Sequence, residues 1–202
     1  MAKRIAIAAS AAALALIGGT YAVTKLASPS VEDCSTTAIA GGAIGGPFTL
    51  VNGAGQTVTH TDVITEPTVI YFGYTFCPDI CPLDVARNVA AVDILAERGV
   101  SATPVFISID PARDTPEVVA DFAANFHPKM IGLTGTPEQV DAASKAYKTY
   151  YSRADDDPDY YLVNHSVFSY LALPDLGVVD FFKQADSPEA VADRVACFAA
   201  AS

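Results

Sequence analysis

The chain is 202 residues long, 51% of them hydrophobic, and its formal net charge is −11 at pH 7. This length suits one domain with additional segments. The acidic balance argues against a nucleic-acid-binding protein, because phosphate backbones are bound by cationic surfaces. It suits an exported domain, in which the charge either serves solubility alone or favours a cationic partner.

The N-terminal segment contains an uncharged apolar stretch at residues 5–24. At about 1.5 Å per residue, a helix of this length would cross a bilayer core of roughly 30 Å. Lys3 and Arg4 precede the stretch and Lys25 follows it, which favours a cytoplasmic N-terminus and an external remainder. The alternative is a cleaved signal peptide. We therefore expect residues 1–27 to be a single transmembrane anchor or a signal peptide, with the domain exported in either case.

The segment after the anchor is predicted to be a tether at residues 28–43, where Ser, Thr, Ala and Gly dominate. The domain proper then covers residues 44–202. It opens with two short β-prone runs, 48–51 and 57–59, on either side of an Asn-Gly turn signal. This pattern predicts a β-hairpin.

The middle of the domain has the pattern of strand, helix, strand. Residues 68–74 (TVIYFGY) are β-branched or aromatic with few polar side chains, which is typical of a strand buried on both faces. A helical stripe of apolar residues follows from Pro82, and Gly99 ends it. A second buried strand is predicted at residues 104–109. Together these elements predict a parallel crossover.

Three later helices share one start signal, a hydroxyl residue followed by proline and glutamate, at Thr115, Thr136 and Ser187. Between the last two helices, residues 166–173 and 178–182 flank a turn and predict an antiparallel hairpin. The element order predicts an α/β fold with a central mixed sheet and flanking helices. Because two thiols follow the first buried strand, we expect this fold to be thioredoxin-like.

Four cysteines occur in the chain, at positions Cys34, Cys77, Cys81 and Cys197. In an oxidising compartment thiols tend to pair, and four cysteines allow three pairings. Cys77 and Cys81 are close enough in sequence to form one pair, which would leave Cys34 and Cys197.

The Cys77–Cys81 segment is predicted to lie over the start of a helix. Pro82 disfavours a helical conformation in the residue before it, so Cys81 is expected to be the N-cap and Pro82 the first helical residue. The backbone N–H groups and the positive end of the helix dipole would then lower the pKa of both thiols.

Three chemistries compete at this pair of thiols. Dithiol–disulfide exchange needs only Cys77 and Cys81, although thioredoxins separate their cysteines by two residues, one fewer than here. Peroxide reduction is disfavoured, because Thr75 lies two residues before Cys77 instead of three. Metal binding is the third, because thiolates are soft donors that suit Cu(I) or Zn(II). A zinc site with four cysteine ligands would require Cys34 and Cys197 to reach the same loop.

A copper site needs fewer ligands, and one imidazole would complete it. The histidines are His60, His127 and His165. His165 immediately precedes a predicted strand, and in a thioredoxin-like sheet the entry to that strand faces the loop after the first buried strand. His165 is therefore the preferred candidate. The chain has two methionines, too few for a methionine-rich copper site.

The motifs GYTFCPDICP, FISIDPARDTPE and YLVNHSVFSYL together resemble the Sco/SenC family of copper-binding proteins, and IGGPFTLVNGAGQTVT matches the first hairpin of that family. The resemblance covers about residues 43–199. It implies a membrane-anchored thioredoxin-like domain that binds one copper ion, as Cu(I) or Cu(II), through two cysteines and one histidine. Carried onto this chain, these ligands are Cys77, Cys81 and His165, and Asp110 matches an acid that supports the site.

The resemblance also implies a function and partners. The chain would be a copper chaperone that assists assembly of the dinuclear copper centre of cytochrome c oxidase. Its partners would be the copper-bearing oxidase subunit, other periplasmic copper chaperones and the inner membrane. The N-terminus lacks an Arg- and Ser-rich transit peptide, which favours a bacterial inner membrane, with the main domain in the periplasm, over a mitochondrion. The alternative function is a thiol–disulfide reductase that keeps the target cysteines reduced, with Cys77 and Cys81 as its redox-active pair.

Two features depart from the family pattern. The family often has an acid before the ligand histidine, but here the residue is Asn164, so the copper affinity or redox preference is expected to differ. The Cys34 and Cys197 pair is not part of the common pattern. We expect it to form a structural disulfide between the tether and the last helix, and the alternative is two unpaired cysteines.

Overall fold

The computed structural model describes residues 30–34, 44–154, 157 and 160–202. No helix within these ranges is both long and apolar enough to cross a bilayer. The anchor or signal peptide predicted at residues 1–27 lies outside the described residues. Most of the predicted tether also lies outside them, but Val31–Cys34 within it forms a short helix, α2.

The domain after the tether alternates strands and helices. Its helices are α3 (His60–Val63), α4 (Ile80–Glu97), α5 (Pro116–Phe126), α6 (Pro137–Ala146) and α7 (Pro188–Ala201). Its strands are β1 (Thr49–Asn52), β2 (Thr57–Thr59), β3 (Thr68–Gly73), β4 (Thr103–Ser108), β5 (Ile131–Thr134), β6 (Tyr151–Arg153), β7 (Val163–His165), β8 (Ser169–Leu173) and β9 (Gly177–Phe182).

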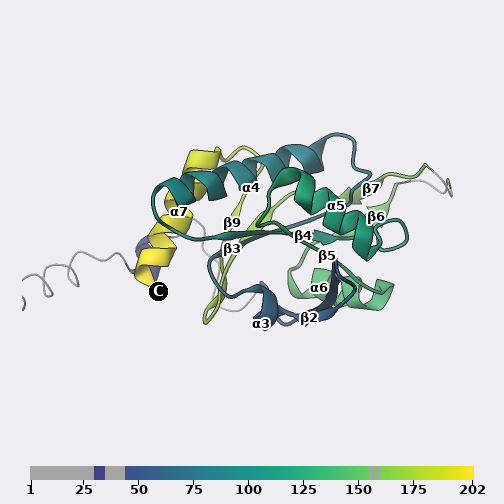
Figure 1. Ribbon diagram of the computed structural model, residues 1–202, viewed down its shortest axis with the longest axis horizontal. Helices are drawn as coiled ribbons and strands as arrows, with labels where there is room; N and C mark the ends of the chain where they lie inside the picture. The colour runs from purple at the N-terminus through teal and green to yellow at the C-terminus, as the bar shows by residue number, and fades with distance from the viewer. Residues whose placement is uncertain (1–29, 35–43, 155–156, 158–159) are drawn as a thin grey trace, which may run out of the picture.

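Seven of these strands form one mixed sheet in the order β2-β1-β5-β4-β3-β8-β9 (Figure 1). β3 and β4 pair in parallel with α4 as the crossover, as predicted, and β5 extends the parallel part. The predicted hairpins β1–β2 and β8–β9 are antiparallel. The expected α/β fold with a central mixed sheet is therefore confirmed.

Helices cover both faces of the sheet, with α4 and α7 on one face and α3 and α6 on the other (Figure 1). Strand β3 is buried throughout, because its alternate side chains meet both layers. On one face Val69 joins a cluster with Leu95 of α4 and Phe198 of α7. On the other face the ring of Phe72 packs against Tyr147, directly after α6. This two-sided burial holds the end of β3 rigidly where the thiols follow.

The three predicted helix starts are confirmed at α5, α6 and α7. The hydroxyls of Thr115, Thr136 and Ser187 each accept a hydrogen bond from the backbone N–H three residues later, so each satisfies one of the amides that a helix start leaves without a partner. Proline is the first residue of each of the three helices, where its missing N–H costs nothing.

Strand β5 is absent from the predicted order. It has four residues and includes Gly132, and glycine weakens a strand pattern in sequence. The glycine is required because α5 packs so closely on β5 that a Cβ at this position would collide with the carbonyl group of Val119. The close packing of α5 therefore requires the glycine that hides this strand in the sequence.

Strands β6 and β7 were also not predicted, and they form a separate two-stranded sheet. Each has three residues, which is too short for a periodic pattern in sequence. This second sheet carries His165.

Candidate metal centre

The cysteine segment joins the end of β3 to the start of α4. The helix begins at Ile80, with Asp79 as its N-cap, so the expectation that Cys81 is the N-cap and Pro82 the first helical residue is wrong. Cys81 and Pro82 lie within the first turn instead. Amides of the first turn have no partner inside the helix, so the proline is tolerated there without losing a helical hydrogen bond.

A thiol performs the capping at this helix start. Asp79 makes no side-chain cap hydrogen bond, but the backbone N–H of Cys81 donates to Sγ of Cys77 at 3.3 Å. Cys77 is half-buried and Cys81 is fully buried, and neither is in a disulfide. The bend therefore presents one accessible sulfur and one enclosed sulfur.

The two thiols differ in acidity. A hydrogen bond from the thiol of Cys81 lowers the pKa of Cys77, and the backbone N–H groups of Cys81 and Asp79 lower it further. The neighbouring Cys77 raises the pKa of Cys81, and burial raises it as well. These surroundings therefore favour the thiolate on the outer sulfur and the protonated thiol on the inner sulfur.

His165 lies at the end of β7, which pairs with β6. Its Nε2 is 3.3 Å from Sγ of Cys81, and its Nδ1 is 2.8 Å from the carbonyl oxygen of Ser166. A carbonyl only accepts, so Nδ1 carries the hydrogen that is bonded to Ser166, and Nε2 is the ring atom that faces the sulfurs. The rings of Tyr71 and Tyr74 meet the imidazole edge-on and restrict its orientation.

The donor atoms of Cys77, Cys81 and His165 all lie within 4.8 Å of one another. Two soft sulfurs and one imidazole nitrogen are a donor set that suits copper. A hollow of about 290 Å³ opens beside them between the cysteine segment and β7. A metal ion held by the three donors would therefore be reachable from solvent on one side.

Cys34 and Cys197 do not join this cluster. They form a disulfide with a Cα–Cα distance of 5.6 Å, which connects α2 to α7. The C-terminal end of α7 lies at the opposite end of the molecule from β7 (Figure 1). A zinc site with four cysteine ligands is therefore excluded.

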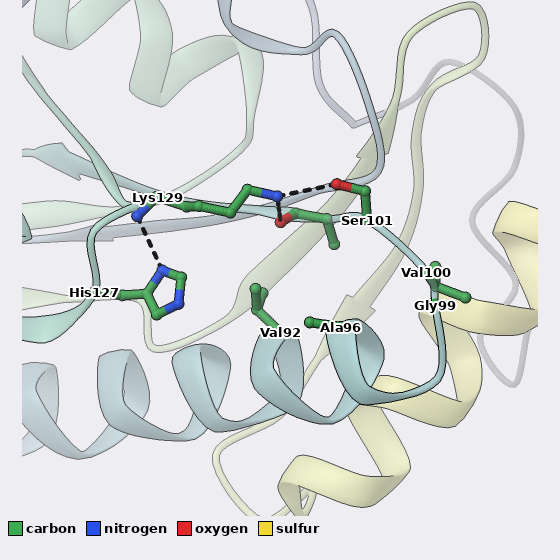
Figure 2. Close-up of a pocket in the computed structure, with 8 residues that line it drawn as sticks. Val92, Ala96, Gly99, Val100, Ser101, His127 and Lys129 are labelled. Atoms are coloured by element: carbon green, nitrogen blue, oxygen red, sulfur yellow. Dashed lines mark hydrogen bonds between the residues drawn. The ribbon is translucent and has the colours of Figure 1, made fainter.

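The other two histidines also lie elsewhere. His60 is the first residue of α3 and packs against Phe48. His127 lines a separate hollow beside α4 (Figure 2), where its Nδ1 accepts the backbone N–H of Lys129 and its Nε2 lies 3.3 Å from Oδ1 of Asp93. Both imidazoles thus serve local packing and hydrogen bonding.

Asp110 lies near the site without contacting its donor atoms. Its Oδ1 accepts from the hydroxyl of Tyr161 and its Oδ2 from Nε of Arg113, both at 2.5 Å. Tyr161 precedes β7, so this buried carboxylate contacts the segment that leads to His165. Asp110 therefore supports the segment before β7 through Tyr161.

Asp114 is a site residue that the sequence interpretation missed. It is buried and accepts hydrogen bonds from the backbone N–H and hydroxyl of Thr75 and from the hydroxyl of Ser108. These bonds fix the start of the cysteine segment to the end of β4. The available signal was a second acid four residues after Asp110, directly before the cap of α5.

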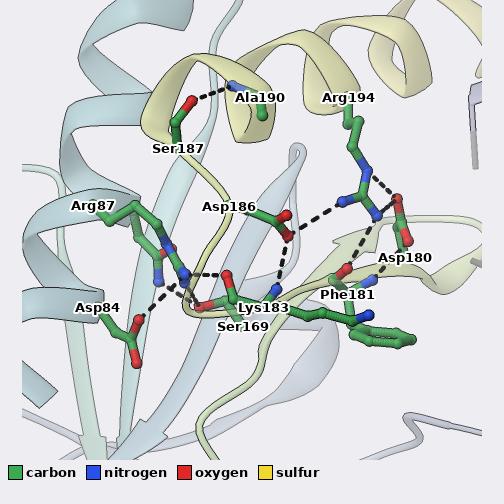
Figure 3. Close-up of polar contacts among 11 residues, drawn as sticks. Asp84, Arg87, Ser169, Asp180, Phe181, Lys183, Asp186, Ser187, Ala190 and Arg194 are labelled. Carbon is green, nitrogen blue, oxygen red and sulfur yellow. Dashed lines mark hydrogen bonds and ion pairs between the residues drawn. The ribbon is translucent and has the colours of Figure 1, made fainter. Parts of the chain in front are cut away.

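A buried polar network anchors α4, the helix that bears Cys81 (Figure 3). Asp84 and Arg87 form an ion pair at 3.2 Å, and Arg87 donates to the hydroxyl of Ser169 and to the carbonyl oxygen of Lys183. Burial raises the pKa of Asp84. Since Arg87 reaches both β8 and the segment after β9, this network attaches the helix that bears Cys81 to the edge of the sheet.

Comparison with known proteins agrees with this arrangement. A sequence model of the SCO1/SenC family matches residues 36–200. The protein SenC of Rhodobacter capsulatus is 52% identical over 97% of this chain and 90% of its own length. The human mitochondrial SCO1 homologue is 40% identical over 84% of this chain and 58% of its own length.

Solved structures agree as well. The crystal structure of Arabidopsis thaliana ScoI with copper bound superimposes with a TM-score of 0.71 at 41% identity, covering 75% of this chain and 94% of that one. The copper-bound structure of Bradyrhizobium japonicum ScoI has a TM-score of 0.65 at 32% identity, covering 76% and 98%. By its sequence and its thioredoxin-like fold, this chain belongs to the SCO1/SenC family.

Proposed function

We propose that this chain is a copper carrier that binds one copper ion through Cys77, Cys81 and His165 and delivers it during assembly of the dinuclear copper centre of cytochrome c oxidase. The observation that carries the proposal is the convergence of two sulfurs and one imidazole nitrogen within 4.8 Å. Copper-bound relatives of the same fold and membership of the family support copper as the metal.

The protonation states of the site favour metal uptake. The thiolate of Cys77 is favoured before metal uptake, because the hydrogen bond from Cys81 lowers the pKa of Cys77. Cys81 keeps its proton, because Cys77 and burial raise its pKa, and copper would displace that proton. Uptake should therefore release about one proton from the site and become tighter as the pH rises.

Release to a partner would start at Cys77. This sulfur is the more accessible of the two and lines the open hollow. A thiolate from the target can approach a copper ion there while Cys81 still holds it. Copper would then pass through shared thiolate intermediates to the copper-bearing subunit of the oxidase, and the same surface could receive copper from another periplasmic chaperone.

The proposed cellular setting is the periplasmic face of a bacterial inner membrane. The uncharged stretch at residues 5–24, with cations mostly before it, supports a single anchor with the N-terminus in the cytoplasm. The disulfide between Cys34 and Cys197 suits an oxidising compartment.

The decisive experiment measures copper binding by the reduced full chain in detergent. Cu(II) should bind at one ion per chain and give a strong sulfur-to-copper absorption in the visible range. His165→Ala should lose most of the Cu(II) affinity, because one of the three donors is gone. His127→Ala is the matched control, since that ring lies in another hollow. Wild-type Cu(II) binding in His165→Ala would contradict the proposal.

A second candidate function is reduction of the cysteines of the target. The pairing of an outer thiolate with an inner protonated thiol suits disulfide exchange. Cys77 would attack the target disulfide and Cys81 would then resolve the mixed disulfide, so two electrons pass to the target and a Cys77–Cys81 disulfide remains.

The two functions separate in one variant. The reductase reaction needs no imidazole ligand, so His165→Ala should retain reduction of a model disulfide while losing Cu(II). Loss of disulfide reduction in proportion to the loss of copper binding would argue against a separate reductase function.

A further inference from the structure

The histidine of the site is carried by a small element outside the main sheet. Strands β6 and β7, here called the arm, pair over three residues each, with Tyr151 opposite His165 and Arg153 opposite Val163. An isolated two-stranded hairpin is marginally stable in water. Contacts with the rest of the molecule must therefore determine where the arm places His165.

Arg113, in the segment between β4 and α5, makes several such contacts. Its Nη1 donates to the carbonyl oxygen of Tyr161 at 3.0 Å, and its guanidinium carbon lies 3.6 Å from the centre of the Tyr161 ring. The same guanidinium lies 4.8 Å from the ring centre of Phe76, the neighbour of Cys77. One side chain thus contacts both Tyr161, two residues before the β7 strand of the arm, and the cysteine segment.

Tyr161 completes the connection from the arm. It is only 5% exposed, and its hydroxyl donates to Asp110. The guanidinium of Arg153, on β6, lies 3.7 Å from the centre of the Tyr161 ring, while Arg113 stacks at 3.6 Å. The phenol therefore ties the arm to the β4–α5 segment through both its ring and its hydroxyl.

The guanidinium of Arg113 is held by stacking on aromatic rings as well as by hydrogen bonds. Its Nε donates to Asp110, but Nη2 is buried and has no hydrogen-bond acceptor among the described residues. A planar guanidinium stacks on aromatic rings, which a lysine ammonium does not do in the same way. The position is thus suited to an arginine that joins three segments in one stack.

We propose that Arg113 and Tyr161, with Asp110 as their shared acceptor, form a clamp that sets the position of His165 relative to the two sulfurs and thereby the preference of the site for Cu(II). This inference rests on the proposed copper function. Neither residue touches the metal-binding atoms, so both are positioning residues. His165 lies four residues after Tyr161, and its ring reaches Cys81 only while the arm is held in place.

The clamp should affect the two copper states unequally. Cu(I) is a soft ion that two thiolates hold well, whereas Cu(II) depends more strongly on a nitrogen ligand. With the clamp intact, all three donors converge and Cu(II) is retained. With the clamp broken, His165 moves away from the sulfurs, and the site keeps Cu(I) but loses much of its affinity for Cu(II).

The first test compares Tyr161→Phe and Arg113→Met with matched controls in the reduced full chain. Tyr160→Phe is the control for the tyrosine, since Tyr160 is 75% exposed. Arg98→Met is the control for the arginine, since its ion pair with Asp193 is exposed. The probes are Cu(II) alone and Cu(I) alone. Cu(II) affinity should fall about 10- to 100-fold in the clamp variants, with weakened nitrogen hyperfine coupling in the electron paramagnetic resonance spectrum.

Affinity for Cu(I) should stay at the wild-type value in the clamp variants, and both controls should behave as wild type. Arg113→Lys, which keeps the charge but not the planar stack, should not restore Cu(II) binding. Unchanged Cu(II) affinity and nitrogen coupling would overturn the clamp. Equal losses of Cu(I) and Cu(II) would overturn it too, because they would indicate a general effect on folding.

The second test needs no copper, so it separates the clamp from the proposed function. Amide hydrogen exchange in β7 should accelerate roughly tenfold in Tyr161→Phe and Arg113→Met, while amides of β3 and β4 keep wild-type rates. If the wild-type chain binds no copper but β7 responds in this way, the copper function fails and the clamp of the arm stands. If copper binds and exchange in β7 does not change, the clamp alone fails.

Discussion

The two pairs of cysteines in this chain lie at opposite ends of the fold and have opposite chemistry. Cys77 and Cys81 are four residues apart and remain free thiols. Cys34 and Cys197 are 163 residues apart and form a disulfide. Closeness in sequence therefore does not decide which cysteines pair. The surroundings in the fold decide it. Cys77 and Cys81 lie at the start of α4 beside the imidazole of His165, whereas Cys34 and Cys197 lie on two helices that pack against each other.

Each end uses its sulfurs for a different purpose. At the disulfide end, Cys34 is buried in a cluster with residues of α7, among them Val195 and Phe198, where a covalent link stabilises the packing of α2. At the thiol end, hydrogen bonds favour a thiolate on Cys77 and the hollow leaves it accessible. Cysteine is therefore structural in the apolar cluster at α7 and reactive at the start of α4, where hydrogen-bond donors and an open hollow adjoin the sulfur of Cys77.

The largest expected effect is the loss of copper binding when one sulfur at the thiol end is removed. Cys77→Ser or Cys81→Ser should abolish copper binding, because a hydroxyl is a poor ligand for a soft ion. The loss of copper affinity should exceed the ~10- to 100-fold that is typical when a residue that only supports a metal ligand is removed. Titration with Cu(I) against a competing chelator measures it. The double variant Cys34→Ser/Cys197→Ser is the control and should bind copper as wild type does; impaired binding there would mean that the two ends are coupled.

The next largest effect is the loss of stability when the disulfide is removed. Cys34→Ser/Cys197→Ser should lower the free energy of unfolding by about 2–5 kcal/mol, since the crosslink no longer restricts the unfolded chain. Urea denaturation of the metal-free protein followed by circular dichroism measures the change. Cys77→Ser is the matched variant, and its free energy of unfolding should fall by less. Equal stability of the double variant and the wild type would refute a structural role for the disulfide.

A third experiment sharpens the contrast in acidity. The pKa of Cys77 is lowered, so its sulfur stays ionised as the pH falls below the ordinary thiol pKa of about 8.5. Alkylation of Cys77 by iodoacetamide should therefore keep nearly the same rate from pH 8 to pH 6. Cys81 should react last, because its pKa is raised and it is buried.

The reference for this experiment is the thiols of the urea-unfolded chain, which should slow about tenfold per pH unit over the same range. Mass spectrometry of peptides after short labelling pulses distinguishes the two cysteines. Parallel pH profiles for Cys77 in the folded and unfolded chains would show that the folded surroundings do not activate it.

The smallest expected effect concerns the support of the cysteine segment. Asp114→Asn should lower the free energy of unfolding by about 1.5–3 kcal/mol, because a buried carboxylate that accepts three hydrogen bonds becomes a weaker acceptor. Asp193→Asn is the matched control on an exposed ion pair, for which we expect less than about 1 kcal/mol. Thermal denaturation of the two variants measures both. Similar small losses in both would mean that Asp114 does not hold the segment.

Much of the fold could be predicted from short patterns. The hydroxyl–proline–glutamate signals located the starts of α5, α6 and α7, because capping depends on a few consecutive residues. The buried runs located β3 and β4. Strand β5 escaped prediction, because Gly132 is present for close packing of α5, and that contact is not a local property of the sequence.

The candidate site could be predicted in its chemistry but not in its support. Spacing marked Cys77 and Cys81, and the expected topology favoured His165, which the structure brings within 3.3 Å of Cys81. The partners of Arg113 and Asp114 could not be foreseen, since both residues contact other segments, although the position of Asp114 directly before the cap of α5 was visible in the sequence. The start of α4 was misplaced for a similar reason, because Cys77 supplies the cap that the sequence assigned to Cys81.

The sequence by itself determined the elements with local causes: helix starts from their caps, buried strands from their apolar runs, and a soft donor pair from two nearby cysteines. Tertiary structure alone decided what those elements meet. It joined Cys34 to Cys197, brought the imidazole from β7 to the start of α4, and stacked Arg113 against both Tyr161, before β7, and Phe76 of the cysteine segment. The physical reason is range, because capping and strand propensity act over a few residues, whereas metal donors and stacked rings need only be close in space.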